Sequence, residues 1–278
     1  MQAFNCLVTG GTSGVGRGIA WALARAGGQV TIVSRDAARG IEAARAIQRE
    51  TGSGSVDSIA ADLSILSSVR ALAERVRSRY PALHVLSLNA ATLAMKRALT
   101  PDGVESIFAA NYLGHFYLAN LLTEALKAGA PSRVLTVVGQ ARLVSSARPA
   151  FDDPASTRGF SPLGATIRAA AAKTLFTFEL ARRLEGTGVT ANAFHPGLVR
   201  SGLPSHLPWF LGAPVRLASV FFAETSETGI YLALSPDVAG ITGKFFERRR
   251  PVPFAPPYDA VAAARELWDL SARLCGIT

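Results

Sequence analysis

The residues with the plainest chemical purpose stand near the start of the chain, in the glycine-rich segment TGGTSGVGRG at positions 9–18. This segment follows a short apolar run and opens a stretch with helical periodicity. Gly10, Gly14 and Gly16 allow a tight turn and let the backbone approach a pyrophosphate at the positive end of a helix. A glycine loop in this setting predicts a dinucleotide-binding site, and the alternative is a turn that is merely tight.

A basic residue stands where the second apolar run ends, in Ser34-Arg35-Asp36. An acidic residue at this point would accept hydrogen bonds from a ribose 2′-hydroxyl, whereas a basic residue suits a 2′-phosphate. Arg35 therefore favours NADP(H) over NAD(H). The alternative is an arginine that only flanks a helix whose N-cap is Asp36.

Short apolar runs alternate with longer segments of helical period along the whole chain. Apolar strands of this kind are typical of a sheet covered on both faces, and their alternation with helices predicts a parallel, doubly wound α/β sheet. No linker divides the pattern, so we expect one domain. The predicted strands are 4–9, 29–34, 58–63, 84–89, 133–138, 189–195 and 243–246, and the predicted helices are 14–27, 36–50, 65–79, 103–128, 164–186 and 226–235.

Composition excludes several classes of protein. The chain has 278 residues, of which 49% are hydrophobic and 18% charged, enough for the core of one large α/β domain. Its two cysteines, Cys6 and Cys275, make no disulfide framework, and no Cys/His spacing predicts a metal site. The N-terminus lacks signal-peptide features and no stretch reaches 18 uncharged apolar residues, so we expect a cytoplasmic protein without a spanning helix.

The chain is basic, with a net charge of +9 and an isoelectric point near 10.2. Its arginines are scattered, and only Arg248-Arg249-Arg250 forms a cluster. This pattern favours a solvated surface and a phosphate-bearing cofactor over a nucleic-acid partner. The apolar segment 206–223, interrupted by Pro208, Pro214 and Arg216, predicts a flap over a pocket, with contact to a membrane surface as the alternative.

These motifs together resemble the short-chain dehydrogenases/reductases, and more narrowly the branch that contains retinol dehydrogenases and protochlorophyllide reductase. TGGTSGVG matches the family's TGxxxGxG loop, and Leu88-Asn89-Ala90-Ala91 stands where the family has NNAG. NYLGHF at 111–116 and the segment 176–203 are close to phrases of that branch, and the match covers essentially the whole chain. The resemblance implies a single Rossmann-type domain, 1–278, with the cofactor bound mainly by 1–135, the active site and substrate in 136–278, and a C-terminal flap at about 198–224.

The resemblance also implies which residues contact the cofactor. Asp62 corresponds to the acidic position on the adenine side. His115 and His195 stand where the branch commonly has histidine, so neither requires a catalytic role. The implied contacts are Gly10, Thr12, Ser13, Gly14, Val15, Gly16, Arg35, Asp62, Leu63, Asn89, Ala90, Pro196, Gly197 and Val199.

The catalytic residues depart from the family's pattern. In the family a tyrosine transfers the proton, a lysine lowers the pKa of that tyrosine, a serine holds the carbonyl oxygen, and an asparagine extends the proton chain through water. Aligning backward from Leu175 places Thr166 at the tyrosine, Ala170 at the lysine and Gly139 at the serine. Of the four residues, only the asparagine, Asn111, is kept.

A threonine hydroxyl can bind a substrate, but it is too weak an acid to replace a phenol. Lys173 shares a helix face with positions 166 and 170 and begins about 4.5 Å further along the axis. It could partly replace the missing lysine, or it could be an ordinary helix lysine. The candidate catalytic residues are therefore Asn111, Thr166 and Lys173, with Gln140 as a candidate for orienting a substrate oxygen.

Three functions fit this pattern. The favoured one is NADP(H)-dependent hydride transfer to a quinone, an extended enone or an aromatic ring, because such products are delocalised anions that need no strong acid. The second is a non-redox cyclase, dehydratase or isomerase, for example in secondary metabolism, with the cofactor structural or idle. The third is a non-catalytic protein that binds NADP(H) or another ligand. Small residues at 139 and 169–172 favour a broad, apolar or aromatic small molecule, and a homo-oligomer is compatible with each function.

Overall fold

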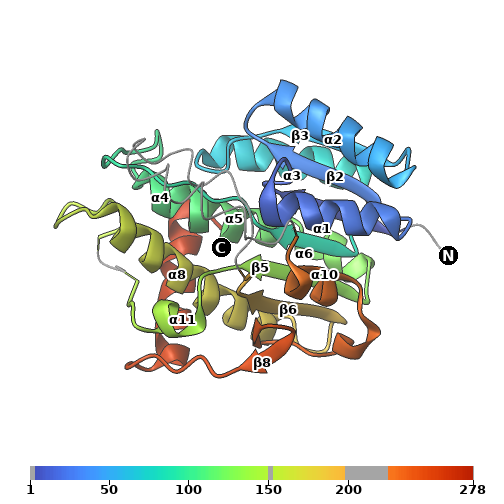
Figure 1. Ribbon diagram of the computed structural model, residues 1–278. Helices are drawn as coiled ribbons and strands as arrows, with labels where there is room; N and C mark the ends of the chain where they lie inside the picture. Colours follow the sequence, from blue (N-terminus) through green and yellow to red (C-terminus); the bar gives the residue numbers. More distant parts are fainter. Residues whose placement is uncertain (1–3, 150–152, 198–224, 278) are drawn as a thin grey trace.

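The computed structural model describes residues 4–149, 153–197 and 225–277 (Figure 1). Within these residues, eight strands form one sheet in the order β3-β2-β1-β4-β5-β6-β7-β8. Strands β1 to β7 run parallel, and β8 pairs antiparallel with β7. The predicted doubly wound α/β fold of Rossmann type in a single domain is confirmed, with one antiparallel edge strand that the sequence patterns did not predict.

The elements alternate as the sequence patterns require. The strands of the sheet are β1 Asn5–Thr9, β2 Gln29–Ser34, β3 Val56–Ala60, β4 Val85–Leu88, β5 Ser132–Val137, β6 Val189–Phe194, β7 Phe245–Glu247 and β8 Arg250–Val252. The helices of the described residues are α1 Gly14–Arg25, α2 Ala37–Thr51, α3 Leu66–Arg79, α4 Ser106–Phe108, the π-helical turn η1 Ala109–Leu113, α5 Gly114–Leu121, α6 Thr123–Ala128, α7 Ala141–Ser145, α8 Pro162–Arg183, α10 Glu227–Leu234, the 3-10 turn η4 Pro236–Val238, and α11 Ala260–Cys275.

Several predicted boundaries differ from the structure by two or three residues, and two of the differences have a visible cause. The third strand lies at Val56–Ala60 rather than 58–63, because the chain leaves the sheet at Asp62, whose Oδ1 accepts hydrogen bonds from the backbone and hydroxyl of Ser64. The predicted helix 103–128 is divided into α4, η1, α5 and α6. It begins where the buried carboxylate of Glu105 accepts the N–H groups of Ile107 and Phe108.

The strand order reverses between β1 and β4, which places the switch point of the sheet at the carboxyl ends of these two strands. Ligands of open parallel sheets bind outside the strands at such a point. The glycine-rich segment leaves β1 at Thr9 and enters α1 at Gly14, so the fold delivers this segment to the switch point.

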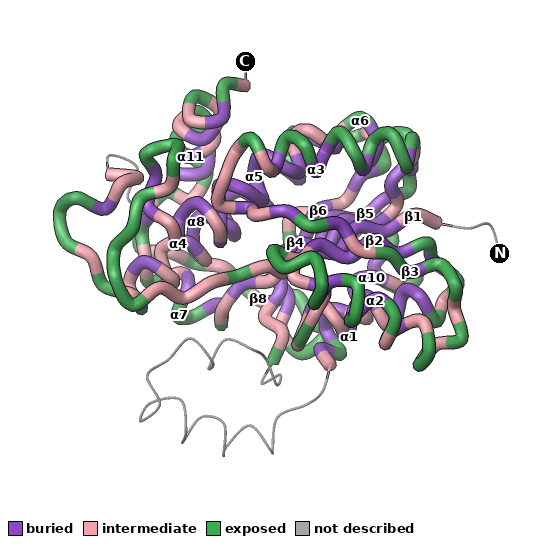
Figure 2. Tube along the Cα trace, turned by 90° about the horizontal axis from the view of Figure 1, so that it is seen from above, coloured by how far each residue is buried: buried purple, intermediate pink, exposed green. Residues whose placement is uncertain are grey.

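Helices cover both faces of the sheet. Figure 2 shows α3, α5 and α6 on one side of the largely buried strands and α1, α2 and α10 on the other. Successive residues of β1 point to opposite faces: Leu7 packs in the core on the α5 and α8 side, whereas Cys6 and Val8 pack against α1. This alternation decides which strand-end side chains point toward α5 and α8.

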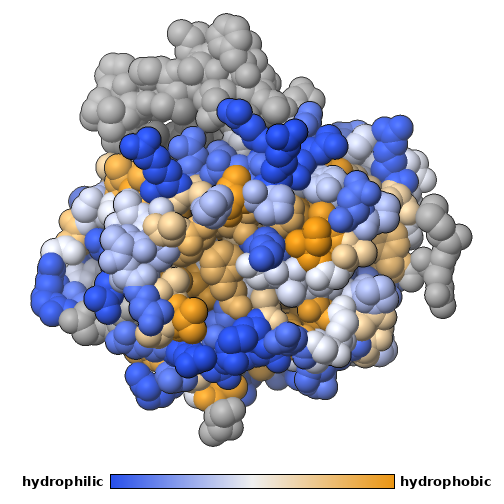
Figure 3. All heavy atoms as spheres, turned by 90° about the horizontal axis from the view of Figure 1, so that it is seen from below, coloured by the Kyte–Doolittle hydropathy of each residue, from blue (hydrophilic) through white to orange (hydrophobic). Residues whose placement is uncertain are grey.

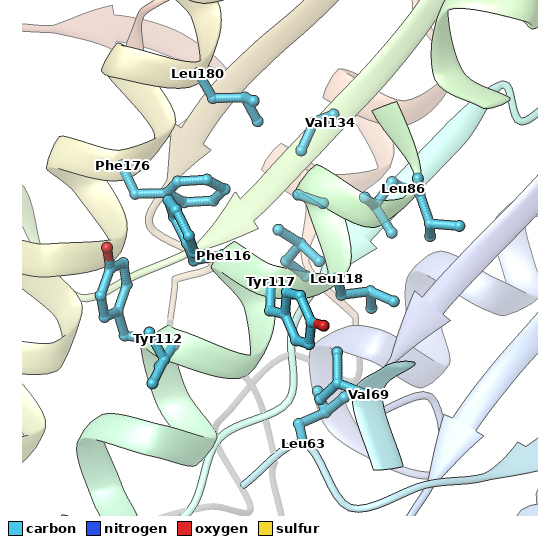
Figure 4. Packing of buried hydrophobic residues seen from close by; sticks show 14 of the residues in the cluster. Leu63, Val69, Leu86, Tyr112, Phe116, Tyr117, Leu118, Val134, Phe176 and Leu180 are labelled. Carbon is cyan, nitrogen blue, oxygen red and sulfur yellow. The ribbon is translucent and has the colours of Figure 1, made fainter. Parts of the chain in front are cut away.

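An aromatic group fixes α8, the helix that carries Thr166 and Lys173. Figure 4 shows the rings of Phe116 and Phe176 next to each other in the core. Trp268 of α11 packs edge-on against Phe116 at 4.9 Å between ring centroids and stacks on Phe176 at 6.2 Å. α8 itself begins with Pro162 after the N-cap Ser161, whose hydroxyl accepts the N–H of Gly164. The sequence patterns did not predict α11.

The one cluster of basic residues in the sequence lies at the last turn of the sheet. Arg248 and Arg249 form the β7–β8 turn with positive φ angles of 47° and 64°, and Arg250 follows in β8. All three are exposed. On the face drawn in Figure 3, hydrophilic side chains are interrupted by hydrophobic areas.

Candidate active site

A cleft of about 730 Å³ opens at the switch point of the sheet. It brings together every predicted cofactor contact that the structure describes, while Val199 and the predicted flap lie outside the described residues. Most of the lining comes from the first 135 residues. The lining residues are Gly10, Thr12, Ser13, Gly14, Val15, Gly16, Val33, Ser34, Arg35, Asp36, Arg39, Ala61, Asp62, Leu63, Asn89, Ala90, Ala91, Thr92, Ala110, Val137, Pro196 and Gly197.

The glycine turn has the shape that a pyrophosphate requires. Gly10 and Gly14 have φ angles of 65° and 53°, in the left-handed region that favours glycine. A Cβ atom on Gly16 would lie 2.4 Å from the carbonyl oxygen of Gly10, so no larger residue fits there. The Ser13 side chain makes no capping bond, and the first turn of α1 contains no acidic residue. The N-terminus of α1 is therefore suited to an anion.

Two arginines lie at the end of the cleft beside β2. Arg35 and Arg39 are both exposed and both line the cleft with Ser34. The Asp36 carboxylate accepts the Arg39 backbone N–H at 3.0 Å, which confirms its predicted role as the N-cap of α2. Arg39 was not among the predicted contacts. Its place in the first turn of α2, the helix that begins just after Arg35, is the signal that could have identified it.

Both polar atoms of the Asn111 side-chain amide form hydrogen bonds to the protein backbone. Its Oδ1 accepts the backbone N–H of Thr92 at 2.7 Å, and its Nδ2 donates to the Thr92 carbonyl at 2.9 Å. Asn111 is 4% exposed and belongs to η1, whereas Thr92 lines the cleft. The amide therefore holds the backbone that forms the floor of the cleft.

The positions predicted to correspond to the family's serine, tyrosine and lysine carry no acid. Gly139 follows β5, and a Cβ atom there would meet only Val144 Cγ2, at 3.1 Å. The Thr166 hydroxyl donates to the Pro162 carbonyl of its own helix at 2.8 Å. Gly139, Thr166 and Ala170 are partly buried, and none of them is among the residues that line the cleft.

Lys173 lies below the cleft rather than in its wall. The side chain is 4% exposed, and its Nζ donates to the Leu88 carbonyl at 3.2 Å. Burial lowers the pKa of Lys173 to about 7. Thr166 and Lys173 thus share a helix, but the structure does not bring both side chains to the cleft, and their catalytic roles stay predictions.

The structure also shows where Gln140, His195 and the small residues of α8 lie. Gln140 is exposed at the N-cap of α7 without a side-chain capping bond. The backbone N–H of His195 donates to the Phe246 carbonyl at 2.9 Å, and burial lowers the pKa of its imidazole. Of the small residues expected beside the substrate, Ala169, Ala171 and Ala172 are fully buried and do not line the cleft, so a preference for a broad substrate stays a prediction.

Two absences hold for the described residues. No three His, Cys, Asp or Glu side chains among them gather closely enough to bind a metal ion. In the same part of the chain, a helix with the length and hydropathy of a membrane span is absent.

A doubly wound parallel sheet with a glycine turn at its switch point defines a Rossmann-type α/β protein of the kind that binds dinucleotides. The family model described as short chain dehydrogenase matches residues 5–150. Human retinol dehydrogenase 14 is 38% identical over 296 residues, which cover 100% of this chain and 88% of that protein. The chain belongs to the short-chain dehydrogenase/reductase family.

Solved structures agree with this assignment. An uncharacterized protein from Mycobacterium paratuberculosis is similar with a TM-score of 0.77 and 32% identity, covering 99% of this chain and 94% of that chain. The RhlG/NADP active-site complex of Pseudomonas aeruginosa is similar with a TM-score of 0.64 and 25% identity, covering 87% of this chain and 93% of that chain.

Proposed function

We propose that this protein binds NADP(H) and transfers hydride to a conjugated, aromatic or quinone-type small molecule without the family's usual Tyr/Lys proton relay. The observation that carries the proposal is the contrast between the two ends of the site. The cleft keeps the glycine turn and two arginines, whereas positions 139, 166 and 170 carry no acid. The assignment of the site residues is part of the proposal.

The preference for NADPH over NADH rests on Arg35 and Arg39. A guanidinium binds a phosphate through charge-assisted hydrogen bonds, and both side chains are exposed where they line the cleft. Asp36 lies beside them, but its carboxylate already caps α2. The similarity to a structure described as an NADP complex supports the same cofactor.

Bound NADPH would supply the hydride, and the chain's own residues would bind and orient both reactants. Gly10, Gly14 and Gly16 would admit the pyrophosphate, and Asn89 and Ala90 would form the floor near the nicotinamide. Reduction of a simple ketone gives an alkoxide, which needs a nearby acid. Reduction of a quinone or enone gives a delocalised anion that water can protonate, so the substitutions at 139, 166 and 170 are compatible with that class of substrate.

One observation favours a second function. Asn111, Thr166 and Lys173 all direct their polar atoms to backbone groups of the protein. A site whose candidate proton donors are engaged in this way also fits a non-redox catalyst, or a protein that binds NADP(H) without turnover.

Calorimetric titration with NADPH and NADH, followed by absorbance at 340 nm with quinone, enone and ketone substrates, tests the proposal. We expect NADPH to bind more tightly than NADH and to be oxidised by a quinone or enone but not by a simple ketone. Binding without oxidation by any of them would favour the second function, and absence of binding would refute both functions that use the cofactor.

A further inference from the structure

The floor segment, residues 88–92, is held from below by side chains of three other elements. Asn111 of η1 binds both backbone groups of Thr92. At the other end of the segment, Lys173 of α8 donates to the Leu88 carbonyl. The segment leaves β4 and then lines the cleft from Asn89 to Thr92, so these contacts set the position of the floor.

The middle of the floor segment is held by Thr9 of β1. The Thr9 hydroxyl oxygen accepts the N–H groups of Asn89 at 2.9 Å and of Ala90 at 3.2 Å. Its own proton is then available for His115 Nε2 at 3.2 Å, a shorter contact than the Ser87 carbonyl at 3.4 Å. Such a bond requires an unprotonated Nε2, which leaves the proton on Nδ1 to donate to the Asn111 carbonyl at 3.2 Å.

His115 is therefore a neutral part of this network. Burial, and then the charge of Lys173, lower the pKa of His115 well below its ordinary value. An imidazolium would also present a donor to Thr9, whose oxygen already accepts two N–H groups. His115 is therefore neutral in the pH range near 7, in which Lys173 gains or loses its proton.

The surroundings of Lys173 do little to stabilise the positive charge of its ammonium group. Within the described part of the chain, its Nζ makes one hydrogen bond and no ion pair. Burial alone accounts for its lowered pKa, and no charged side chain of α4, α7, α11, β5 or β6 contributes. The carboxylate of Glu179, on the same helix, binds Arg182 and Arg183 instead.

The groups that face Lys173 from the sheet do not titrate near neutrality. β4 presents the Leu88 carbonyl, and β1 presents Thr9 in the neighbouring strand. Thr136 of β5 pairs with Leu88, and its buried hydroxyl has no hydrogen-bond partner among the described residues. From the helices, η1 contributes the neutral Asn111 and α5 contributes His115. A change in protonation below the cleft near neutral pH would therefore be a change of Lys173.

We propose that Lys173 is a positioning residue: its ammonium holds the floor segment through the Leu88 carbonyl, and loss of its proton loosens that hold and weakens cofactor binding. The proposal rests on the proposed NADP(H) site. A hydrogen bond from a charged donor is stronger than one from a neutral amine, so the hold weakens as pH rises through about 7. The residue acts through the floor segment and does not touch the reacting atoms.

Hydrogen exchange of the cofactor-free protein tests the hold itself. After correction for intrinsic rates, the amides of residues 89–92 in the wild type should exchange roughly 3- to 10-fold faster at pH 8 than at pH 6. In the Lys173→Met variant, the same amides should exchange fast at both pH values. In Lys173→Gln, which keeps a donor that does not titrate, exchange should be the same at both. Equal protection of the wild type at the two pH values would overturn the proposal without any variant.

NADPH titration between pH 6 and 9 tests the consequence for the cofactor. The 2′-phosphate itself titrates near pH 6, so the readout is the difference between wild type and Lys173→Met. The wild type should lose about 3- to 10-fold in affinity relative to the variant as pH rises from 6 to 8. The matched control is Lys127→Met, which removes an exposed lysine paired with Glu124 and should follow the wild type.

The two proposals fail in different ways. Parallel pH profiles of the wild type and Lys173→Met, in exchange and in binding, would contradict the role of Lys173 and leave NADP(H) binding intact. Absence of NADPH binding at every pH, with the expected exchange pattern, would contradict the proposed function and support the hold on the floor segment.

Discussion

The Thr166 hydroxyl donates to the Pro162 carbonyl, four residues earlier in α8, at 2.8 Å. The side chain that we align with the family's tyrosine therefore donates its one hydroxyl proton within its own helix. Ala170, one turn further along the helix, has no polar atom to redirect it. A reaction at this site would therefore need a substrate whose reduced form does not require a proton from the protein.

The triple variant Gly139→Ser, Thr166→Tyr and Ala170→Lys should acquire weak carbonyl reductase activity. A phenol beside an ammonium supplies the missing acid, and the new serine Cβ requires a shift of only a few tenths of an ångström in the Val144 methyl. NADPH oxidation with a simple ketone or retinal measures the gain. Robust turnover of these substrates by the wild type would contradict the alignment of the catalytic positions.

Arg35→Ala should weaken NADPH binding by about 1–3 kcal/mol and leave NADH binding nearly unchanged, because in the proposed binding mode the guanidinium would contact only the 2′-phosphate. Arg39→Ala should act in the same direction. Calorimetry with both cofactors separates the two effects. The control is Arg45→Ala, which changes an exposed arginine of α2 outside the cleft. An equal loss for NADPH and NADH would refute the assignment.

Asn111→Ala should lower stability by about 1–3 kcal/mol, because it leaves the buried backbone groups of Thr92 without their partners. It should also slow turnover more than Thr166→Val does. Denaturant unfolding and NADPH oxidation rates measure the two effects. Thr166→Val is the matched control, since the hydroxyl that it removes bonds only within α8. A Thr166→Val variant slower than Asn111→Ala would show that the hydroxyl serves the reaction.

Lys173 should make stability depend on pH. Its pKa is about 7 in the folded protein and near 10.5 in the unfolded chain, so between these values the unfolded state binds one more proton. Stability then rises with pH across this window, by up to about 1.4 kcal/mol per pH unit, and the buried charge costs most below pH 7. Lys173→Met should remove the slope and raise the free energy of unfolding at pH 6. A less stable variant at pH 6 would contradict the buried-charge account.

Opposite signs of these two effects would identify a positioning role. At pH 6 we expect the ammonium to lower global stability while it strengthens the hydrogen bond to the Leu88 carbonyl. A lysine that merely filled space would affect unfolding and cofactor binding in the same direction.

Local patterns predicted the cofactor side of the fold. The glycine turn and Arg35 are read from contiguous residues, because a strand end, a turn and a helix start follow one another along the chain. Arg39 was missed because its place depends on how α2 leaves β2. The rotation of α8 was also beyond the sequence patterns, and Ala169 and Ala172 therefore lie in the core instead of facing the cleft.

The floor of the cleft could not be predicted in the same way. Thr9 and His115 are 106 residues apart, and Lys173 and Leu88 are 85 apart. Their contacts arise only when β1, β4, α5 and α8 are packed together. The sequence placed Lys173 on the face of positions 166 and 170, but the depth of α8 in the core decides that its Nζ meets a strand carbonyl rather than the cleft.

The most direct test of the central claim is transfer of deuterium from NADPH labelled at C4 of the nicotinamide to a quinone or enone substrate. Because either hydrogen at C4 could be transferred, both stereospecifically labelled forms are used and the product is analysed by mass spectrometry. With an enone, we expect deuterium on product carbon from one of the two forms and one NADPH oxidised per product formed. With a quinone, we expect one NADPH oxidised per hydroquinone formed, because a label on oxygen exchanges with solvent. For an enone the label stays on carbon, whereas the added proton comes from solvent. Product formed without cofactor oxidation and without label in either form would contradict the account and identify a non-redox catalyst.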